Sequence, residues 1–155
     1  MTFIVDGTNG LTFPNSTVQA SAGNVLQVIN ATYSTLVTST TSTLIDTGLT
    51  ATITPKFATS KILVIVNQPI RVASSALATF YLNRAGTNIK QLWTAWGYLS
   101  TMSAQMSFSY LDSPATTSAT IYKTQFSNAF AVGTVSISPD GSTDLSTITL
   151  MEIAA

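Results

Sequence analysis

Apolar and polar residues alternate along short segments of this chain, and clusters of turn-forming residues separate the segments. The alternation is clearest in residues 106–110 and 122–126, where every second position is aromatic, Met or Thr. Side chains two apart share one face of a strand, so each segment predicts a strand with an aromatic face. Pro114 cannot donate to a ladder and ends the first segment. The pattern therefore predicts a long β-hairpin of residues 108–114 and 120–126, with the other strands packed around it.

Further segments of the same kind occupy most of the remaining chain. They predict strands over residues 2–6, 25–33, 44–54, 61–67, 75–83, 89–96, 133–138 and 144–154. Residues 34–43 are rich in Ser and Thr and predict an exposed loop or edge segment. Short strands at this spacing, with no helical periodicity between them, predict an all-β domain over residues 25–155. We expect an antiparallel β-sandwich or jelly roll.

Residues 1–24 differ from this domain. Turn clusters break them into short extended pieces, and the small residues 20–24 predict a joint before the domain. They predict an extended N-terminal arm. The arm carries large apolar side chains that must be buried somewhere: Phe3, Ile4, Leu11 and Phe13. Either the arm folds back on its own domain, or it grips a neighbouring subunit or a docking surface through these four residues.

Residues 61–67 form the most apolar strand, with five consecutive apolar positions and therefore two apolar faces. In an antiparallel sandwich one face of a sheet normally meets water. A second apolar face requires either a covering loop or another subunit. We expect the subunit contact to use one face of this strand and the aromatic faces of the hairpin: Ile62, Val64, Val66, Phe108, Tyr110, Tyr122 and Phe126. The opposite face of the strand, Leu63 and Ile65, is the alternative.

The composition is unusual in its low charge. The chain is 45% hydrophobic and only 8% charged, where roughly 25% is usual, and six basic residues balance six acidic ones. A neutral surface offers no footprint for phosphate backbones, so we expect no nucleic acid partner. Low net charge also protects poorly against self-association, so a partner is expected to cover the apolar faces.

The chain lacks the residues of the common catalytic centres. It has no cysteine and no histidine, which excludes thiolate chemistry, zinc–thiolate sites and a Ser-His-Asp triad. Its acidic residues lie mostly in or beside turns, where Asp bonds to its own backbone, whereas glycoside hydrolysis needs two facing carboxyl groups. Residues 140–144 predict a turn rather than a calcium loop. We therefore predict no enzyme, no metal and no cofactor.

Two tryptophans share the strand over residues 89–96. Trp93 and Trp96 are three positions apart and so point to opposite faces, one into the core and the other to solvent or an interface. Aromatic side chains are common anchors at binding sites. Trp96 and Tyr98 are therefore the candidate contacts for a glycan.

Several segments resemble a known family when taken in order. They are residues 11–19 (LTFPNSTVQ), 42–55, 59–66, 110–114, 122–126 and 146–153. The first is similar to a segment common before the C-terminal modules of tailed-phage fibre and virion proteins. The whole set resembles phage structural proteins abundant in viruses of aquatic bacteria. The resemblance implies a homotrimeric, jelly-roll-like β domain on the virion surface, with no catalytic residues.

Only the arm precedes the domain, so we expect a compact trimer and not a long fibre. The leading hypothesis is a capsid decoration (cement) protein whose arm binds the major capsid protein. The alternatives are a head- or tail-fibre knob that recognises host glycan, and a soluble carbohydrate-binding module. The N-terminus lacks a basic n-region, and no apolar run reaches the roughly 18 residues of a membrane span. We expect synthesis in the host cytoplasm, no membrane partner, and a final location on the outer surface of the virion.

Overall fold

The computed structural model describes residues 25–138, 140 and 143–154, together with the backbone of three short N-terminal strands. These are β1 (Ile4–Asp6), β2 (Gly10–Thr12) and β3 (Val18–Gln19), which pair antiparallel in a small sheet of their own. Phe3 and Phe13 of the predicted docking arm lie outside the described residues. Ile4 and Leu11 are described by their backbone alone, in β1 and β2.

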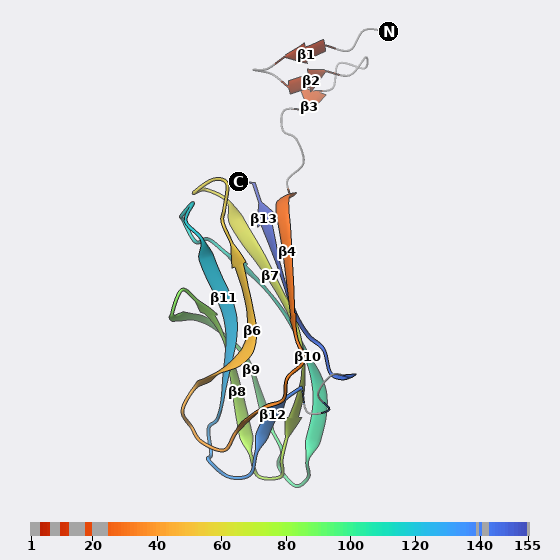
Figure 1. Ribbon diagram of the computed structural model, residues 1–155, viewed down its shortest axis with the longest axis vertical. Coiled ribbons are helices and arrows are strands. Elements are labelled where there is room, and N and C mark those ends of the chain that lie inside the picture. Colours follow the sequence, from red (N-terminus) through yellow and green to blue (C-terminus); the bar gives the residue numbers. More distant parts are fainter. Residues whose placement is uncertain are drawn as a thin grey trace.

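Two antiparallel sheets packed face to face make up the rest of the fold, as Figure 1 shows. The first contains β4 (Val25–Tyr33), β5 (Val37–Ser39), β7 (Lys61–Val72), β10 (Met102–Asp112), β12 (Val135–Ile137) and β13 (Ser146–Ile153). The second contains β6 (Ile45–Ile53), β8 (Leu77–Arg84), β9 (Thr87–Trp96) and β11 (Thr120–Asn128). No helix in this part of the chain is long and apolar enough to cross a membrane. The predicted all-β sandwich is confirmed.

The strands pair in a nested order. β8 and β9 form a hairpin whose turn residues, Ala85 and Gly86, both have positive φ, as a tight turn between twisted strands requires. Around this hairpin β7 pairs with β10, β6 with β11, and β4 with β13, each time antiparallel. The two sheets therefore run β4-β13-β7-β10 and β6-β11-β8-β9. In the first sheet β12 pairs with β7 just beyond the N-terminal end of β13, and β5 pairs with β12 at the edge.

The predicted hairpin between residues 108–114 and 120–126 is wrong. The two segments are strands, but β10 pairs with β7 whereas β11 pairs with β6 and β8, so residues 113–119 cross from one sheet to the other. In a hairpin both aromatic faces would lie on one side of a single sheet. The crossing places them on opposite walls of the core, where each covers the other.

The core fills the space between the sheets. Its largest fully buried side chains are Tyr122, Phe80, Phe126, Leu49, Ile53, Ile62, Ile70, Leu82, Ile137, Ile148, Leu150 and Gln68. Trp93 stacks on Phe80 with ring centroids 6.2 Å apart, so it is the core tryptophan of the pair.

The residues expected at the trimer interface belong to this core. Ile62, Val64, Val66, Tyr122 and Phe126 are completely buried within one chain. Phe108 and Tyr110 are half-buried on the same inward face of β10. The interface prediction is therefore wrong for the five buried residues, which the same chain already covers, whereas Phe108 and Tyr110 stay partly exposed.

One buried carboxylate holds the loop between β6 and β7. Glu152 accepts hydrogen bonds from Gln27 Nε2 (2.6 Å) and from the backbone N–H groups of Lys56 (2.7 Å) and Phe57 (3.4 Å). Burial by itself raises the pKa of Glu152, but these hydrogen bonds outweigh burial and hold the pKa below its ordinary value of 4.5. The neighbouring Ser60 Oγ makes no hydrogen bond in the described part of the chain.

We expect Glu152→Gln to lower the free energy of unfolding at pH 7 by about 1–3 kcal/mol, because an amide cannot accept all the bonds that the carboxylate accepts. A lowered folded-state pKa means that the unfolded chain binds the proton more tightly, so this stabilisation is present above pH 4.5 and is lost as the pH falls through the folded pKa. Urea unfolding at several pH values measures both effects. Asp140→Asn, which removes an exposed ion pair with Arg71, serves as the control and should change stability by less than about 0.5 kcal/mol. A Glu152→Gln variant as stable as the parent at pH 7 would contradict this assignment.

Candidate functional site

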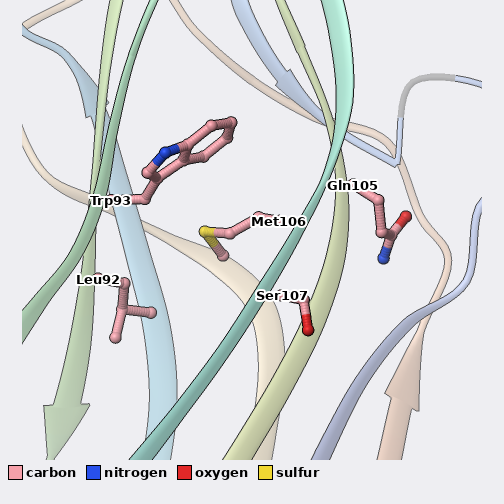
Figure 2. Close-up of a pocket in the computed structure, with 5 residues that line it drawn as sticks. All are labelled: Leu92, Trp93, Gln105, Met106 and Ser107. Carbon is pink, nitrogen blue, oxygen red and sulfur yellow. The ribbon is translucent and has the colours of Figure 1, made fainter.

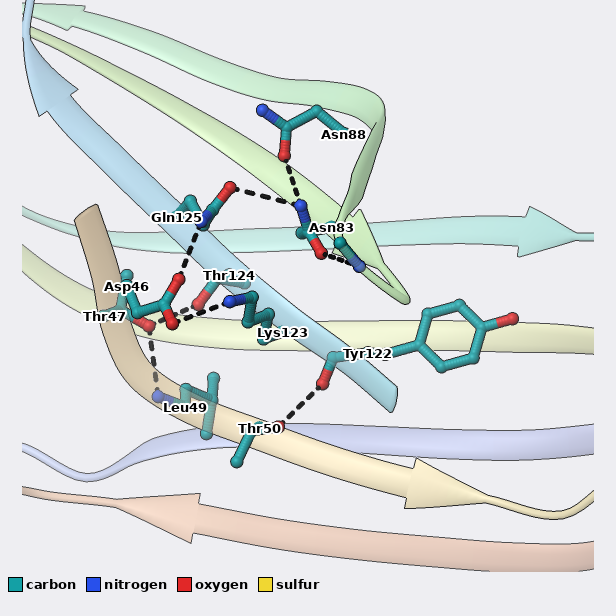
Figure 3. A network of polar contacts seen from close by, with 11 residues as sticks. Asp46, Thr47, Leu49, Thr50, Asn83, Asn88, Tyr122, Lys123, Thr124 and Gln125 are labelled. Carbon is teal, nitrogen blue, oxygen red and sulfur yellow. Dashed lines mark hydrogen bonds and ion pairs between the residues drawn. The ribbon is translucent and has the colours of Figure 1, made fainter. Parts of the chain in front are cut away.

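The outer faces of the two sheets differ in polarity. The outer face of the sheet β6-β11-β8-β9 carries a polar network, part of which Figure 3 shows, and next to it the exposed Ile121. Asp46 accepts from Lys123 Nζ and Gln125 Nε2, both at 2.7 Å, and Asn83 Nδ2 donates to Gln125 Oε1 at 3.3 Å and to Asn88 Oδ1 at 2.8 Å. A face whose polar groups are paired in this way suits contact with water.

The outer face of the sheet β4-β13-β7-β10 carries an apolar row. Met151 lies beside both Val28 and Leu63 in the ladder, and Leu63 lies beside Leu111, so four strands contribute one apolar residue each. Val28 and Leu111, at the two ends of the row, are 54% and 49% exposed. Ile65 is half-buried in the next row. Directly neighbouring side chains on one face are about 5 Å apart, so this apolar row is continuous.

This row corresponds to the alternative face of the apolar strand. Leu63 and Ile65 point outward, whereas Ile62, Val64 and Val66 point into the core. Both faces of the strand are apolar, as predicted, and no loop of the described chain covers the outer one completely, because Val28 and Leu111 remain exposed. The apolar row is therefore a candidate interaction surface.

A second apolar surface lies where the loops of the sandwich meet. Trp96, Tyr98 and Phe130 are 52%, 61% and 50% exposed. The ring of Trp96 lies 4.6 Å from Tyr98 and 6.0 Å from Phe130, centroid to centroid, with interplanar angles of 70° and 89°. We call these three residues the aromatic cluster. The sequence predicted that one tryptophan would lie in the core and the other at an interface or in solvent, and Trp96 is the exposed one. Trp96 and Tyr98 stay the predicted glycan contacts, and the fold adds Phe130, which sequence reasoning missed.

Hydrogen bonds fix the loops that carry the aromatic cluster. The buried Asn128 donates from Nδ2 to the carbonyls of Val132 (2.8 Å) and Gly133 (3.2 Å), and its Oδ1 accepts from Leu77 N–H at 3.3 Å. The backbone of Gly97 donates to the Ala76 carbonyl at 3.0 Å. Two of these bonds hold the loop of Phe130 in shape and two connect the loops to residues 76 and 77, so the exposed rings stand on an ordered base.

Two further features carry no catalytic chemistry. Asp112, the most buried aspartate, accepts from Tyr122 Oη at 2.6 Å and from Arg84 Nη1 at 2.8 and 2.9 Å, so its oxygens are occupied within the fold. Burial, and then the bond to Asp112, raise the pKa of the Tyr122 hydroxyl. Among the described residues, no three carboxylates come together as a metal site would need.

A groove of about 290 Å³ opens between the edge strands β9 and β10. It is lined by Leu92, Trp93, Gln105, Met106 and Ser107, which Figure 2 shows. None of these side chains is charged, and the groove reaches core residues rather than a set of converging polar groups. The only potential nucleophile in its lining is the Ser107 hydroxyl, and no lining residue could act as the base that would activate it.

The fold and these surfaces define an antiparallel β-sandwich protein with an apolar row on one outer face and one aromatic loop cluster. The sequence matches no protein-family model and no curated protein. Among solved structures it is similar to the VP2 subviral particle of infectious bursal disease virus, with 15% identity and a TM-score of 0.38 over 83% of this chain. A structure of the Gx strain of the same virus gives 16% identity and a TM-score of 0.36 over 83% of this chain. The chain spans only 38% and 37% of those proteins. At these scores the likeness decides neither fold nor function.

We expect Gly97→Ala to lower the free energy of unfolding by roughly 2–3 kcal/mol. A Cβ at this position would lie 2.2 Å from the Ala73 carbonyl oxygen and 3.0 Å from that of Val72, and both are backbone atoms that cannot turn aside. Thermal unfolding followed by circular dichroism measures the effect. Ser100→Ala, an exposed position in the same loop, is the control and should change stability by less than about 0.5 kcal/mol. Equal melting temperatures for the two variants would contradict the close approach of these loops.

Proposed function

We propose that this protein is a structural component of a phage virion and that it acts as a trimeric capsid decoration protein bound to the major capsid protein. The resemblance of its segments to phage structural proteins supports the phage setting. Trimers fit the three-fold positions of an icosahedral shell by symmetry. Binding to the assembled shell would favour the assembled state by mass action and so stabilise the head.

The order of the strands supports a jelly roll. The first strand of the domain, β4, pairs with the last, β13, while β6 pairs with β11 and β7 with β10, so the pairs nest around the β8–β9 hairpin. This is the order obtained when one long hairpin is rolled into two Greek keys, an architecture used by viral capsid and lectin domains among others. Because one fold serves many functions, the proposal depends on the surface and not on the fold alone.

The apolar row is the observation that carries the proposal. The outer face of one sheet carries a network of paired polar groups beside the exposed Ile121, whereas the other exposes Val28 and Leu111 at the ends of a continuous apolar row across four strands. The row lies toward the end of the sandwich where β4 begins and β13 ends (Figure 1).

We expect the purified protein to be a trimer at micromolar concentration, and we expect Val28→Glu and Leu111→Glu to dissociate it. An uncompensated charge in an apolar contact costs roughly 3–5 kcal/mol, which weakens association by at least about a hundredfold. Multi-angle light scattering and sedimentation velocity measure the mass. Thr52→Glu, at an exposed position on the outer face of the other sheet, is the matched control and should leave the trimer intact. A monomeric parent protein would remove the support for the trimer.

We expect purified virions to contain hundreds of copies of this protein, because a decoration protein occupies repeated positions over the shell. Quantitative mass spectrometry against the major capsid protein gives the copy number, and electron microscopy of labelled particles gives the location. A few dozen copies or fewer, at a vertex or on the tail, would contradict decoration. That result would favour the second candidate function, a fibre knob that recognises a host glycan, for which the exposed aromatic cluster is the specific support.

A further inference from the structure

The loop end of the sandwich combines exposed aromatic rings with an absence of charge. We define the loop end as residues 40–44, 73–76, 97–101 and 129–134, the connections that lie at the lower end of Figure 1. Hydrogen bonds join all four: Asn128 N–H reaches the Thr41 carbonyl, Ala73 N–H the Thr134 carbonyl, and Gly97 N–H the Ala76 carbonyl. None of the residues in these four loops is Asp, Glu, Lys or Arg.

We propose that the loop end binds a neutral carbohydrate through the aromatic cluster. Sugar rings expose apolar C–H faces that pack on aromatic rings, and their hydroxyl groups need partners that both donate and accept. Ser and Thr hydroxyls do both, and exposed examples flank the cluster in the two neighbouring loops: Ser74, Ser75, Ser100 and Thr101. A surface without charge offers no counter-ion for sialic acid, uronic acids or phosphate, which is why the ligand is assigned as neutral.

The geometry of the rings narrows the ligand further. Tyr98 and Phe130 both stand steeply to the plane of Trp96, so the cluster presents ring faces in more than one direction and not as one flat platform. A flat platform suits the side of a long, straight polysaccharide. Rings at steep angles suit a terminal or branch-point sugar, which has several faces to contact.

Two other occupants fit the loop end less well. Surfaces that bind anionic membranes carry Lys and Arg beside their apolar groups, and this loop end has neither. A protein partner would be expected to meet a rim of charged and polar groups around the aromatic centre, whereas the loop end has no charged residue and adds the exposed Leu99 and Val132 to its rings. Both alternatives are outcomes of the experiment below.

The order of the loops favours a ligand of low mass. Asn128 fixes the loop that carries Phe130, and the Gly97 backbone fixes the loop that carries Tyr98. Exposed rings held in place lose little conformational freedom on binding, which matters most for a ligand that makes few contacts. The inference that this site lies on a virion rests on the proposed function. Sugar binding itself can be measured with the isolated protein.

The test is binding of the purified full-length protein to an array of neutral and sialylated oligosaccharides, followed by titration of the best binder with intrinsic tryptophan fluorescence. We expect binding to neutral oligosaccharides only, with a change in fluorescence from the exposed Trp96. Trp96→Ala and Phe130→Ala should each weaken binding about tenfold or more, because both remove a ring of the cluster. Circular dichroism confirms that each variant is folded.

Phe57→Ala is the matched control, because Phe57 is equally exposed (56%) but lies in the loop between β6 and β7, outside the loop end. It should bind the oligosaccharide as the parent does. Binding to sialylated oligosaccharides alone, binding to no oligosaccharide, or equal loss in Phe57→Ala would overturn the proposal. So would a fluorescence shift produced by phosphatidylcholine vesicles and not by sugar. These outcomes are independent of the copy number on virions, so the carbohydrate site and the decoration role can fail separately.

Discussion

Two sheets packed face to face have four faces, and in the part of the chain that the structure describes only the inner two are fully covered. The inner faces meet in a core from which residues such as Phe80 and Tyr122 are wholly excluded from water. What the molecule contacts is therefore decided by the outer faces and the loops. One outer face is occupied by the Asp46 network, and a charged and amide-rich face of this kind is costly to dehydrate. Dehydrating the apolar row or the loop end does not carry this free-energy cost, so these two surfaces are better suited to contact with a partner.

The crossing between β10 and β11 makes the two inner faces possible. Asp112 at the end of β10 is bonded to Tyr122 on β11 and to Arg84 on β8, so one carboxylate joins a strand of the first sheet to two strands of the second. Its partners are a hydroxyl and a guanidinium, which satisfy a carboxylate that has little access to water. This bonded group closes the core at the end where residues 113–119 pass between the sheets.

Alternation along the chain was enough to predict where the strands lie, because it depends on neighbours two positions apart. β4 has the predicted bounds, and most other predicted strands differ by a few residues. The pairing of the strands could not be predicted in this way. Nothing local in the sequence shows that residues 108–112 pair with residues 62–66, more than forty positions earlier, and not with the nearby segment 120–126. For the fully apolar strand, no local feature distinguishes Ile62 and Val64 from Leu63 and Ile65. The facing sheet buries Ile62, Val64 and Val66, the residues that were expected at the interface, and Leu63 and Ile65 lie on the outer face.

The same limit explains why one member of the aromatic cluster was missed. Trp96 and Tyr98 are close in sequence, but Phe130 reaches them only through the fold, from a loop whose small neighbours gave no strand pattern. The fold also separates the two candidate surfaces. The apolar row lies toward the end where β4 begins, and the aromatic cluster lies among the loops at the other end (Figure 1). Contacts at one surface therefore leave the other free, so association of copies through the apolar row is compatible with the proposed recognition of a sugar at the loop end.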